Sequence, residues 1–537
     1  MTTFRLSPSL LAIALCGMVV GHPAAAETVV EPAAGAEPIP LGTTKAVTGK
    51  RMIVRGGIMV TGRGTPASGR AVPPEGPVDI IIEQGRIVDI VPFDAVSARS
   101  GLATRPTGDV VIDASGKYVL PGLFDLHAHI PDARQAGAHS YAYAFRLWLG
   151  HGFTTLRDAG ASDFPALVEQ KRLSDAHSII APRVQIYKRW PNTARTRDKG
   201  HTPDEARALV RQYRSQGADG IKISHGPGTY PDVIAAITDE AAKLGMGGVM
   251  VDLKVSEADA RVASQAGVTS IEHWYGVPDA ALSGTQNFPY DYNYLDELQR
   301  FRQAGYLWKQ ADADPDALEA VIDELIANKT AWVPTFAIYE ASTDFMRVVT
   351  LPWRETLVHP TMLDQWRPRA DVHASFHTDW KTSDEIAWKD NYQRWMRWLH
   401  RFWAKGGLVG LGSDSGSQQS LYGFGAVREF ELMQQAGIHP LDVVKIATTN
   451  SAAVAGLDKG LCGIRQGCIA DLVVVDGNPL DNFKLLYGAG FAHYGTDRSG
   501  GGVIWTIKEG EAYDAQALLR EAKWYVAQEK AAAGASD

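Results

Sequence analysis

Hydrophobic and polar positions alternate in two different ways along the middle of this chain. Short runs rich in Val, Ile and Leu are separated by stretches with the three-to-four-residue periodicity of amphipathic helices. One such stretch opens with the helix-start signal Thr202-Pro203-Asp204-Glu205 and ends at Gly217. The short runs predict eight strands, at residues 123–129, 153–157, 183–187, 220–224, 247–252, 268–273, 330–335 and 408–414.

Strand and helix alternate eight times within about 290 residues, which predicts an α/β fold, a (β/α)8 TIM barrel with a helical insert near residues 340–406. The active sites of such barrels lie where the strands end. Polar residues that close the predicted strands are therefore the candidates for chemistry.

The regions on both sides of the barrel have a different pattern. Runs rich in Ile and Val, punctuated by Gly and Pro, occur at residues 52–60, 78–91, 109–120, 470–476 and 503–507. They predict one small β-sandwich domain built from the N- and C-terminal segments, followed by a helix from Asp514. The expected limits are 27–50 for a linker, 51–120 and 455–537 for the two parts of the sandwich, and 121–454 for the barrel.

The N-terminus has the features of a secretory signal peptide. A short apolar run at residues 10–21 follows Arg5, and three alanines precede Glu27. This pattern predicts removal of residues 1–26 and a secreted or periplasmic protein. The run is too short to span a bilayer.

Composition excludes some classes of partner. The hydrophobic content of 45% is that of an ordinary globular protein, and the net charge of −8 argues against nucleic acid. Once the signal peptide is removed, the remaining cysteines are Cys462 and Cys468. They could pair in an oxidising compartment or remain two buried thiols, and the sequence leaves both possibilities open.

The first predicted barrel strand ends in two histidines one residue apart. Residues two apart on a strand point to the same face, so His127 and His129 direct their imidazoles toward one point. Two neutral imidazoles there suit a divalent metal. The alternative is a pair of polar histidines in the core or in a loop.

Three further strands end in residues with metal or proton chemistry. Lys222 lies between two isoleucines, where an ammonium must be paired, neutralised or modified. His273 closes the sixth run, and Asp414 closes the eighth, where a carboxylate can bind a metal and move a proton. Each has an ordinary structural explanation alone, but together they indicate a site at the mouth of a barrel.

These segments resemble those of metal-dependent amidohydrolases, especially the branch of imidazolonepropionases, Xaa-Pro dipeptidase-like enzymes and ochratoxinase-like carboxypeptidases. The similar segments are residues 121–129, 153–158, 217–222, 266–273, 412–414 and 463–480. The resemblance implies a site for one or two divalent ions, often zinc, with His127, His129 and Asp414 on one ion. Lys222, carboxylated by carbon dioxide, would bridge to a second ion held by His273 and by a histidine on the fifth strand.

The fifth strand departs from that pattern, because the position of the family's histidine is occupied by Asp252. A carboxylate can still bind zinc, so the second ion could be retained, weakened or lost. Lys254 lies on the same face of the strand and could pair with Asp252 instead. The departure leaves the metal count open.

The substrate side of the barrel is rich in aromatic residues. Residues 340–406 contain seven of the fourteen tryptophans, several at helical spacing: Trp388, Trp395, Trp398 and Trp403. They could form packing contacts or a wall of an apolar pocket. Tyr230 resembles a tyrosine that polarises the scissile carbonyl in the dipeptidase relatives, and Arg189 and His201 are candidates for a substrate carboxylate.

The expected function is metal-dependent hydrolysis of amide bonds in small molecules such as dipeptides or N-acyl amino acids. A metal-activated hydroxide would attack the carbonyl, and Asp414 would be the proton shuttle. Lactone hydrolysis and deamination would use the same groups, and a barrel that lost its metal could be a binding protein. We expect neither nucleic acid nor membrane as a partner, and a homo-oligomer is possible.

Overall fold

The computed structural model describes most of the chain after the predicted signal peptide. The described residues are 27–33, 35–65, 69–94, 96, 99–100, 105–131, 139–191, 200–224, 230–253, 258–282, 289–293, 296–369, 377–488 and 501–534. Residues 1–26 and Lys254, which carry two of the sequence-based predictions, lie outside this set.

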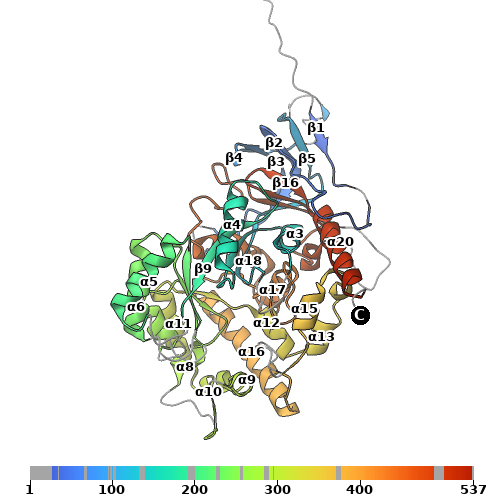
Figure 1. Cartoon of the computed structure of the whole chain (residues 1–537). Helices are drawn as coiled ribbons and strands as arrows, with labels where there is room; N and C mark the ends of the chain where they lie inside the picture. Colours follow the sequence, from blue (N-terminus) through green and yellow to red (C-terminus); the bar gives the residue numbers. More distant parts are fainter. Residues whose placement is uncertain are drawn as a thin grey trace, which may run out of the picture.

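The barrel is built on a parallel sheet in which the strands follow one another in chain order. Its strands are β7 (Leu123–Ala128), β8 (Phe153–Asp158), β9 (Arg183–Arg189), β10 (Gly220–Ser224), β11 (Val249–Asp252), β12 (Ser270–Glu272) and β13 (Ala331–Val333). Strand β9 is labelled in Figure 1, with helices α5 (Pro203–Ser215) and α6 (Pro231–Lys243) nearby. All of the strands are buried almost throughout, as expected for a parallel sheet covered by helices. Seven of the eight predicted strands are therefore confirmed within two or three residues.

Residues 408–415 take the place of the eighth strand and close the barrel. Parallel bridges join Val409 to Trp332 next to β13, and Ser415 to Ala128 on β7. The carboxylate of Asp125 accepts the backbone N–H of Ser413 at 3.0 Å, so this amide is not available for a regular ladder. The segment is therefore an irregular strand, and the predicted (β/α)8 barrel is confirmed.

Helices cover the outside of the barrel. They are α3 (Tyr141–Gly150), α4 (Phe164–Asp175), α5 (Pro203–Ser215), α6 (Pro231–Lys243), α7 (Ala260–Gln265), α8 (Val277–Ala281), α9 (Glu297–Ala304), α10 (Leu307–Ala311), α11 (Pro315–Ala327), α17 (Phe424–Gln435), α18 (Pro440–Lys445) and α19 (Ser451–Val454), with η2 (Ile446–Asn450) between the last two. Helix α5 begins as predicted, because Thr202 and Glu205 form a reciprocal capping box. No helix in the described part of the chain combines the length and apolarity needed to cross a bilayer.

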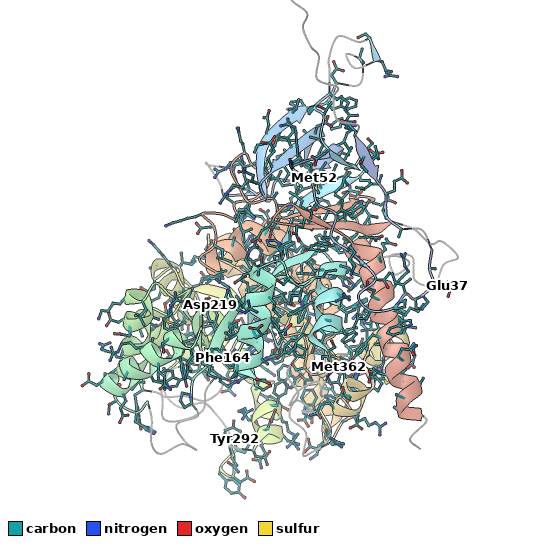
Figure 2. The ribbon with its side chains drawn as sticks, turned by 45° about the horizontal axis from the view of Figure 1, so that its top comes forward. Glu37, Met52, Phe164, Asp219, Tyr292 and Met362 are labelled. Atoms are coloured by element: carbon teal, nitrogen blue, oxygen red, sulfur yellow. A yellow bond between two sulfur atoms is a disulfide. The ribbon has the colours of Figure 1, made fainter. Side chains whose placement is uncertain are left out.

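The N- and C-terminal segments form a second, nine-stranded sheet. Its strands are β1 (Thr28–Val30), β2 (Arg51–Met59), β3 (Glu75–Glu83), β4 (Arg86–Pro92), β5 (Val110–Asp113), β6 (Tyr118–Pro121), β14 (Leu472–Asp476), β15 (Gly502–Lys508) and β16 (Glu511–Asp514). The two halves of the chain meet where β6 pairs with β14. The sheet curls around its own apolar core, which includes Met52 (Figure 2), and Phe164 belongs to the separate barrel core.

The segment predicted as a linker contributes directly to this second sheet. Strand β1 pairs in parallel with β5, and Val47 bridges to Ala512 next to β16. Residues 27–50 are therefore tied to the sheet at two places, because their backbone groups find partners there. The C-terminal helix is present as predicted and spans α20 (Ala515–Gly534), with η3 (Phe483–Tyr487) earlier in this part.

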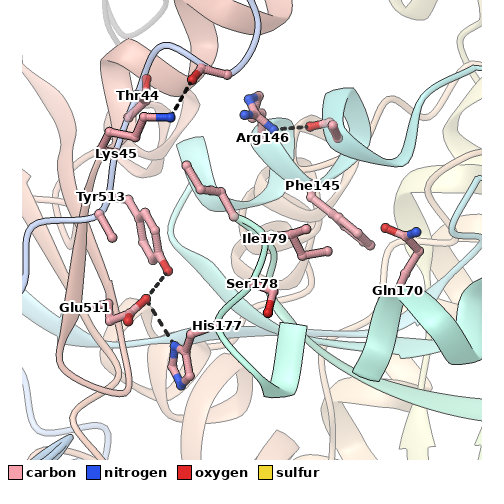
Figure 3. Close-up of a pocket in the computed structure, with 14 residues that line it drawn as sticks. Thr44, Lys45, Phe145, Arg146, Gln170, His177, Ser178, Ile179, Glu511 and Tyr513 are labelled. Atoms are coloured by element: carbon pink, nitrogen blue, oxygen red, sulfur yellow. Dashed lines mark hydrogen bonds and ion pairs between the residues drawn. The ribbon is translucent and has the colours of Figure 1, made fainter. Parts of the chain in front are cut away.

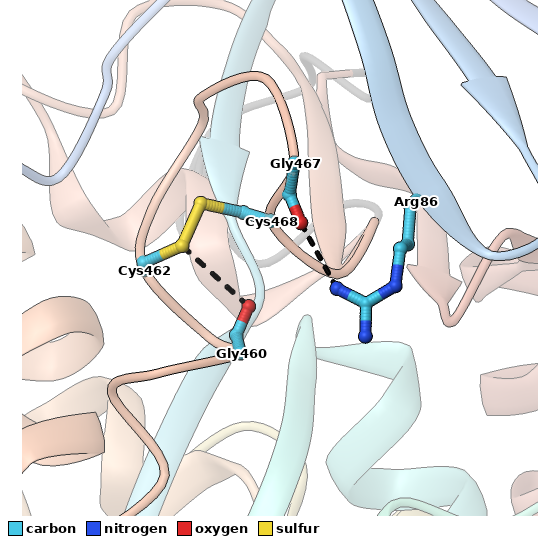
Figure 4. Close-up of a disulfide and its surroundings, with 5 residues drawn as sticks. All are labelled: Arg86, Gly460, Cys462, Gly467 and Cys468. Atoms are coloured by element: carbon cyan, nitrogen blue, oxygen red, sulfur yellow. Dashed lines mark hydrogen bonds between the residues drawn. A yellow bond between two sulfur atoms is a disulfide. The ribbon is translucent and has the colours of Figure 1, made fainter.

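Cys462 and Cys468 form a disulfide in the loop that leads from α19 to β14 (Figure 4). Their Cα atoms are 5.6 Å apart, a normal separation for a disulfide. Of the two possibilities that the sequence left open, the structure contains the paired one.

The helical insert follows β13 and packs beside the barrel. It comprises α12 (Phe336–Tyr339), η1 (Glu340–Ser342), α13 (Phe345–Val349), α14 (Arg354–Leu357), α15 (Pro360–Gln365) and α16 (Thr382–Ala404). Trp388, Trp395 and Trp398 of α16 are buried, and the ring of Trp388 stacks on Phe301 of α9 at 4.6 Å. Trp403 carries the guanidinium of Arg70 over its ring. These contacts favour the packing explanation of the tryptophan pattern.

Candidate metal centre

Side chains from three well-separated parts of the barrel meet at the ends of its strands. His127 is the second-last residue of β7, His273 follows β12, and Asp414 lies in the closing segment. One ligand atom from each of these residues lies within 4.8 Å of the others. His273 and Asp414 have positive φ angles of 62° and 55°, a strained conformation for residues other than glycine. The surrounding barrel therefore enforces the convergence of these side chains.

Asp414 lies at the centre of this group. Its Oδ1 is 2.9 Å from Nε2 of His129 and 3.7 Å from Nε2 of His127, and its Oδ2 is 3.9 Å from Nε2 of His273. Burial alone would raise the pKa of Asp414, but the adjacent imidazoles hold this pKa well below its usual range. Asp414 is therefore a carboxylate surrounded by three histidines.

Lys222 reaches the same group from β10. Its side chain is 2% exposed, and Nζ lies 3.4 Å from Nε2 of His127. Burial lowers the pKa of Lys222 to about 8, although Asp252 and Glu272 oppose this shift. Burial at this position therefore favours the uncharged form of the amine.

Asp252 also belongs to this group. It ends β11, is buried, and places Oδ2 at 3.8 Å from Nε2 of His273. The alternative partner Lys254 lies outside the described residues. All six residues predicted from the sequence as metal ligands thus lie together, whereas their role as ligands stays a prediction.

A buried ion pair that the sequence analysis did not identify supports His127. Nδ1 of His127 lies 2.6 Å from Oε2 of Glu272, and Arg157 donates from Nη2 to Oε1 of the same carboxylate at 2.8 Å. Glu272 and Arg157 are completely buried. In the sequence, Arg157 and Glu272 are visible only as single charged residues within apolar strands. Their pairing with each other is seen in the structure alone.

Thr335 plays a similar part beside His273. Its Oγ1 lies 2.6 Å from Nδ1 of His273, and the same hydroxyl donates to the carbonyl of Pro334 at 2.6 Å. Thr335 has a positive φ of 54° and is fully buried at the end of β13. No pattern in the sequence singles out this threonine.

The three predicted substrate-binding residues lie at different places. Arg189 ends β9 and pairs in register with Lys222, and its Nη2 donates to the carbonyl of Ala159 at 3.4 Å. Tyr230 is 49% exposed at the start of α6. His201 precedes α5, where its backbone N–H donates to Glu205. Arg189 is thus the one of the three that adjoins a residue of the candidate metal centre in the strand register.

A pocket of about 360 Å³ lies elsewhere, between α3, the loop at residues 177–180 and β16 (Figure 3). Its polar groups bind one another: Glu511 accepts from the hydroxyl of Tyr513 at 2.7 Å and pairs with Nδ1 of His177 at 3.1 Å. None of the six predicted metal ligands lines this pocket. We therefore assign the candidate site to the strand ends and not to this pocket.

This protein is a parallel barrel with imidazoles and a carboxylate close together at the strand ends. That arrangement is typical of barrel hydrolases that use a metal ion. A sequence profile described as the amidohydrolase family matches residues 118–298 and 397–512, more than half of the chain, so the protein belongs to this family. The predicted family and the predicted enzyme class, a hydrolase that acts on carbon–nitrogen bonds, are confirmed.

Solved structures share the fold at low sequence identity. A bottromycin amidohydrolase has a TM-score of 0.61 and 18% identity, covering 89% of this chain and 91% of its own. A Xaa-Pro dipeptidase with bound methionine has a TM-score of 0.58 and 19% identity, covering 86% and 100%. Ochratoxinase from A. niger has a TM-score of 0.55 and 17% identity, covering 87% and 96%. At these identities the likeness establishes the fold alone.

Sequence relatives match over shorter segments. A dihydroorotase from Trichlorobacter lovleyi is 35% identical over 79 residues, which is 15% of this chain and 16% of the relative. An allantoinase from Streptomyces avermitilis is 27% identical over 115 residues, 21% of this chain and 24% of the relative. The chain thus matches less than a quarter of these curated relatives.

Proposed function

We propose that the protein is a metal-dependent hydrolase of amide bonds in small molecules, with dipeptides or N-acyl amino acids as substrates. The observation that carries the proposal is the convergence of His127, His273 and Asp414 at the barrel mouth. The family is generally metal-dependent, and this donor set of two imidazoles and a carboxylate fits a divalent ion.

Zinc is the ion that we propose, because imidazole and carboxylate are its usual ligands in catalytic sites. His127, His129 and Asp414 would hold one ion, and His273 and Asp252 would offer ligands for a second. A divalent ion supplies Lewis acidity and makes water a stronger acid.

Asp414 is the residue that we propose to move the proton. Its Oδ1 lies beside His127 and His129, and its Oδ2, 3.9 Å from Nε2 of His273, would accept a proton from the attacking water and return it to the leaving nitrogen. One group then acts first as base and afterwards as acid.

Lys222 is the residue that we propose to be carboxylated. Only an uncharged amine adds to carbon dioxide, and the burial of Lys222 lowers its pKa, which favours that form. Carboxylation would turn a buried side chain that can be a cation into an anion. This anion would lie near Nε2 of His127, which is 3.4 Å from Nζ of Lys222. This exchange would supply a further anionic ligand for metal.

The proposal is tested with purified protein and a panel of N-acyl amino acids, dipeptides, lactones and aminated heterocycles. We expect cleavage of amide substrates and little turnover of the other two classes. The control is Asp414→Asn, which keeps the shape of the side chain and removes the base, and it should lose amide hydrolysis. Lactone or deaminase activity without amide cleavage would contradict the proposed substrate class, and no turnover of any class would favour a binding protein.

We also propose that the protein is exported. Support comes from the signal-like segment at residues 1–26 and from the Cys462–Cys468 disulfide, since disulfides persist in oxidising compartments.

A further inference from the structure

In two histidines of the candidate metal centre, the ring nitrogen that points away from the centre contacts another side chain. Nδ1 of His127 meets Glu272 and Nδ1 of His273 meets Thr335, both at 2.6 Å. Nε2 of each ring faces the centre, where it approaches Asp414 within 3.7 Å and 3.9 Å respectively. Which nitrogen carries the proton is decided by what its partner can accept.

Glu272 must act as an acceptor toward His127. Its other oxygen, Oε1, already accepts hydrogen bonds from Arg157 at 2.8 Å and from the hydroxyl of Ser270 at 2.5 Å. An ionised carboxylate beside a buried guanidinium has no proton to donate. Nδ1 of His127 therefore carries the hydrogen, and its Nε2 lone pair is available to Nζ of Lys222, 3.4 Å away.

Thr335 is also an acceptor, for a different reason. A hydroxyl has one hydrogen, and that of Thr335 is donated to the carbonyl of Pro334. Oγ1 can then only accept from Nδ1 of His273. The positive φ of Thr335 places the hydroxyl at this position, so the strained backbone has a use in the site.

His129 has the opposite arrangement. Its Nε2 lies 2.9 Å from the carboxylate of Asp414, and its Nδ1 meets no hydrogen-bond partner among the described residues. We expect the hydrogen of a neutral His129 on Nε2, the ring nitrogen that lies beside this carboxylate. This histidine provides a comparison inside the same site.

We infer that Glu272 and Thr335 are positioning residues that fix His127 and His273 as Nδ1–H tautomers, so that both Nε2 lone pairs face the centre before any ion arrives. The inference rests on the proposed metal site but not on any particular substrate. The two supports are unequal, since a charge-assisted hydrogen bond to a carboxylate is stronger than one to a hydroxyl. Outer partners of this kind raise the basicity of a ligand and orient its ring.

The direct test is nitrogen NMR of protein labelled with ¹⁵N-histidine and stripped of metal, because the shifts of Nδ1 and Nε2 report which one is protonated. Each signal is assigned by its loss in single His→Gln variants. We expect Nδ1–H for His127 and His273 and Nε2–H for His129. Nε2–H at His127 or His273 would overturn the inference, whether or not the protein hydrolyses an amide.

The second test compares matched variants by zinc affinity, measured by competition with a chromophoric chelator. Thr335→Val keeps the shape of the side chain and removes the acceptor, whereas Thr335→Ser keeps the hydroxyl. We expect Thr335→Val to bind zinc about tenfold more weakly and Thr335→Ser to bind as the parent does. Equal affinity in the valine and serine variants would overturn the role of Thr335.

Glu272→Gln is the corresponding change beside His127, and we expect a loss of about 10- to 100-fold in zinc affinity. Because this variant also leaves Arg157 without its anion, Arg157→Met/Glu272→Gln is measured beside it to restore the charge balance. Circular dichroism confirms that each variant is folded. Parent-like affinity in both folded variants would overturn the role of Glu272. A parent that binds zinc with the expected tautomers but cleaves no amide would refute the proposed function and leave this inference standing.

Discussion

Asp252 is the residue at which this chain departs from the amidohydrolases that it resembles. It lies 3.8 Å from Nε2 of His273, at the end of the strand where those enzymes carry a histidine. A carboxylate at this position can still complete a second metal site, although it changes the charge of that site. We therefore expect the side chain at position 252 to determine how many ions the barrel binds.

We predict that Asp252→Ala lowers the metal content of the second site and that Asp252→His keeps or raises it. The reason is that alanine removes a ligand and histidine restores one. Elemental analysis of metal per chain, with the rate of amide hydrolysis measured beside it, checks the prediction. Two ions per chain in both the parent and Asp252→Ala would show that the fifth strand supplies no essential ligand.

We predict that Lys222→Ala lowers both the metal affinity and the rate of amide hydrolysis at least about tenfold. The reason is that the carbamate supplies a ligand that alanine cannot. Short carboxylic acids added to this variant should restore part of both. Lys222→Arg is a control that keeps a cation but cannot form the carbamate, and it should stay inactive. Full activity in the alanine variant would exclude a bridging role for Lys222.

At the scale of elements, the sequence predicts strands better than it predicts their partners. The apolar runs with polar ends predict β7 to β13 almost at their observed limits. The reason is that strands buried on both faces of a parallel sheet are nearly continuous apolar runs. The segment at 408–415 is irregular because the side chain of Asp125, 288 residues away, takes one of its amides. Glu272 and Thr335 likewise depend on contacts with residues from other strands, which no local pattern encodes.

One buried carboxylate of the C-terminal helix α20 contacts two distant parts of the chain. Glu521 pairs with Arg146 of α3 and accepts the backbone N–H groups of Gly42, at 2.9 Å, and Thr44. Burial raises the pKa of Glu521. The hydrogen bonds from the two amides and from Arg146 together lower this pKa by more, so the net shift is downward. Three segments far apart in the sequence thus meet at one side chain.

We predict that Glu521→Gln lowers the free energy of unfolding by about 3 kcal/mol at pH 7, because it leaves Arg146 buried without its anion. A folded-state pKa below the unfolded value stabilises the protein above that unfolded value, about 4.3, and this gain is lost as the pH falls through the folded-state pKa. The difference between parent and variant should therefore shrink in acid. Urea unfolding at pH 7 and pH 4 measures it.

The control for this prediction is Glu529→Gln on the same helix. Glu529 is 42% exposed and lies 3.7 Å from His359, so its replacement should cost less than about 1 kcal/mol. Equal losses in the two variants would contradict the special role of Glu521.

At the scale of the whole molecule, the second sheet joins strands from the N-terminal and C-terminal segments beside the barrel (Figure 1). We predict that protein isolated from its native host begins near Glu27, since the preceding residues have the pattern of a cleaved signal peptide. Intact-mass measurement of that material is sufficient. A mass that includes Met1 would contradict the prediction of export.

The central claim is that the strand-end residues hold a metal on which amide hydrolysis depends. The most direct measurement is the rate of N-acyl amino acid hydrolysis by the parent protein before chelation, after removal of metal, and after stoichiometric zinc is added back. We predict that activity disappears with the metal and returns with zinc, while Asp414→Asn stays inactive throughout. Hydrolysis that continues unchanged in the metal-free protein would contradict the claim.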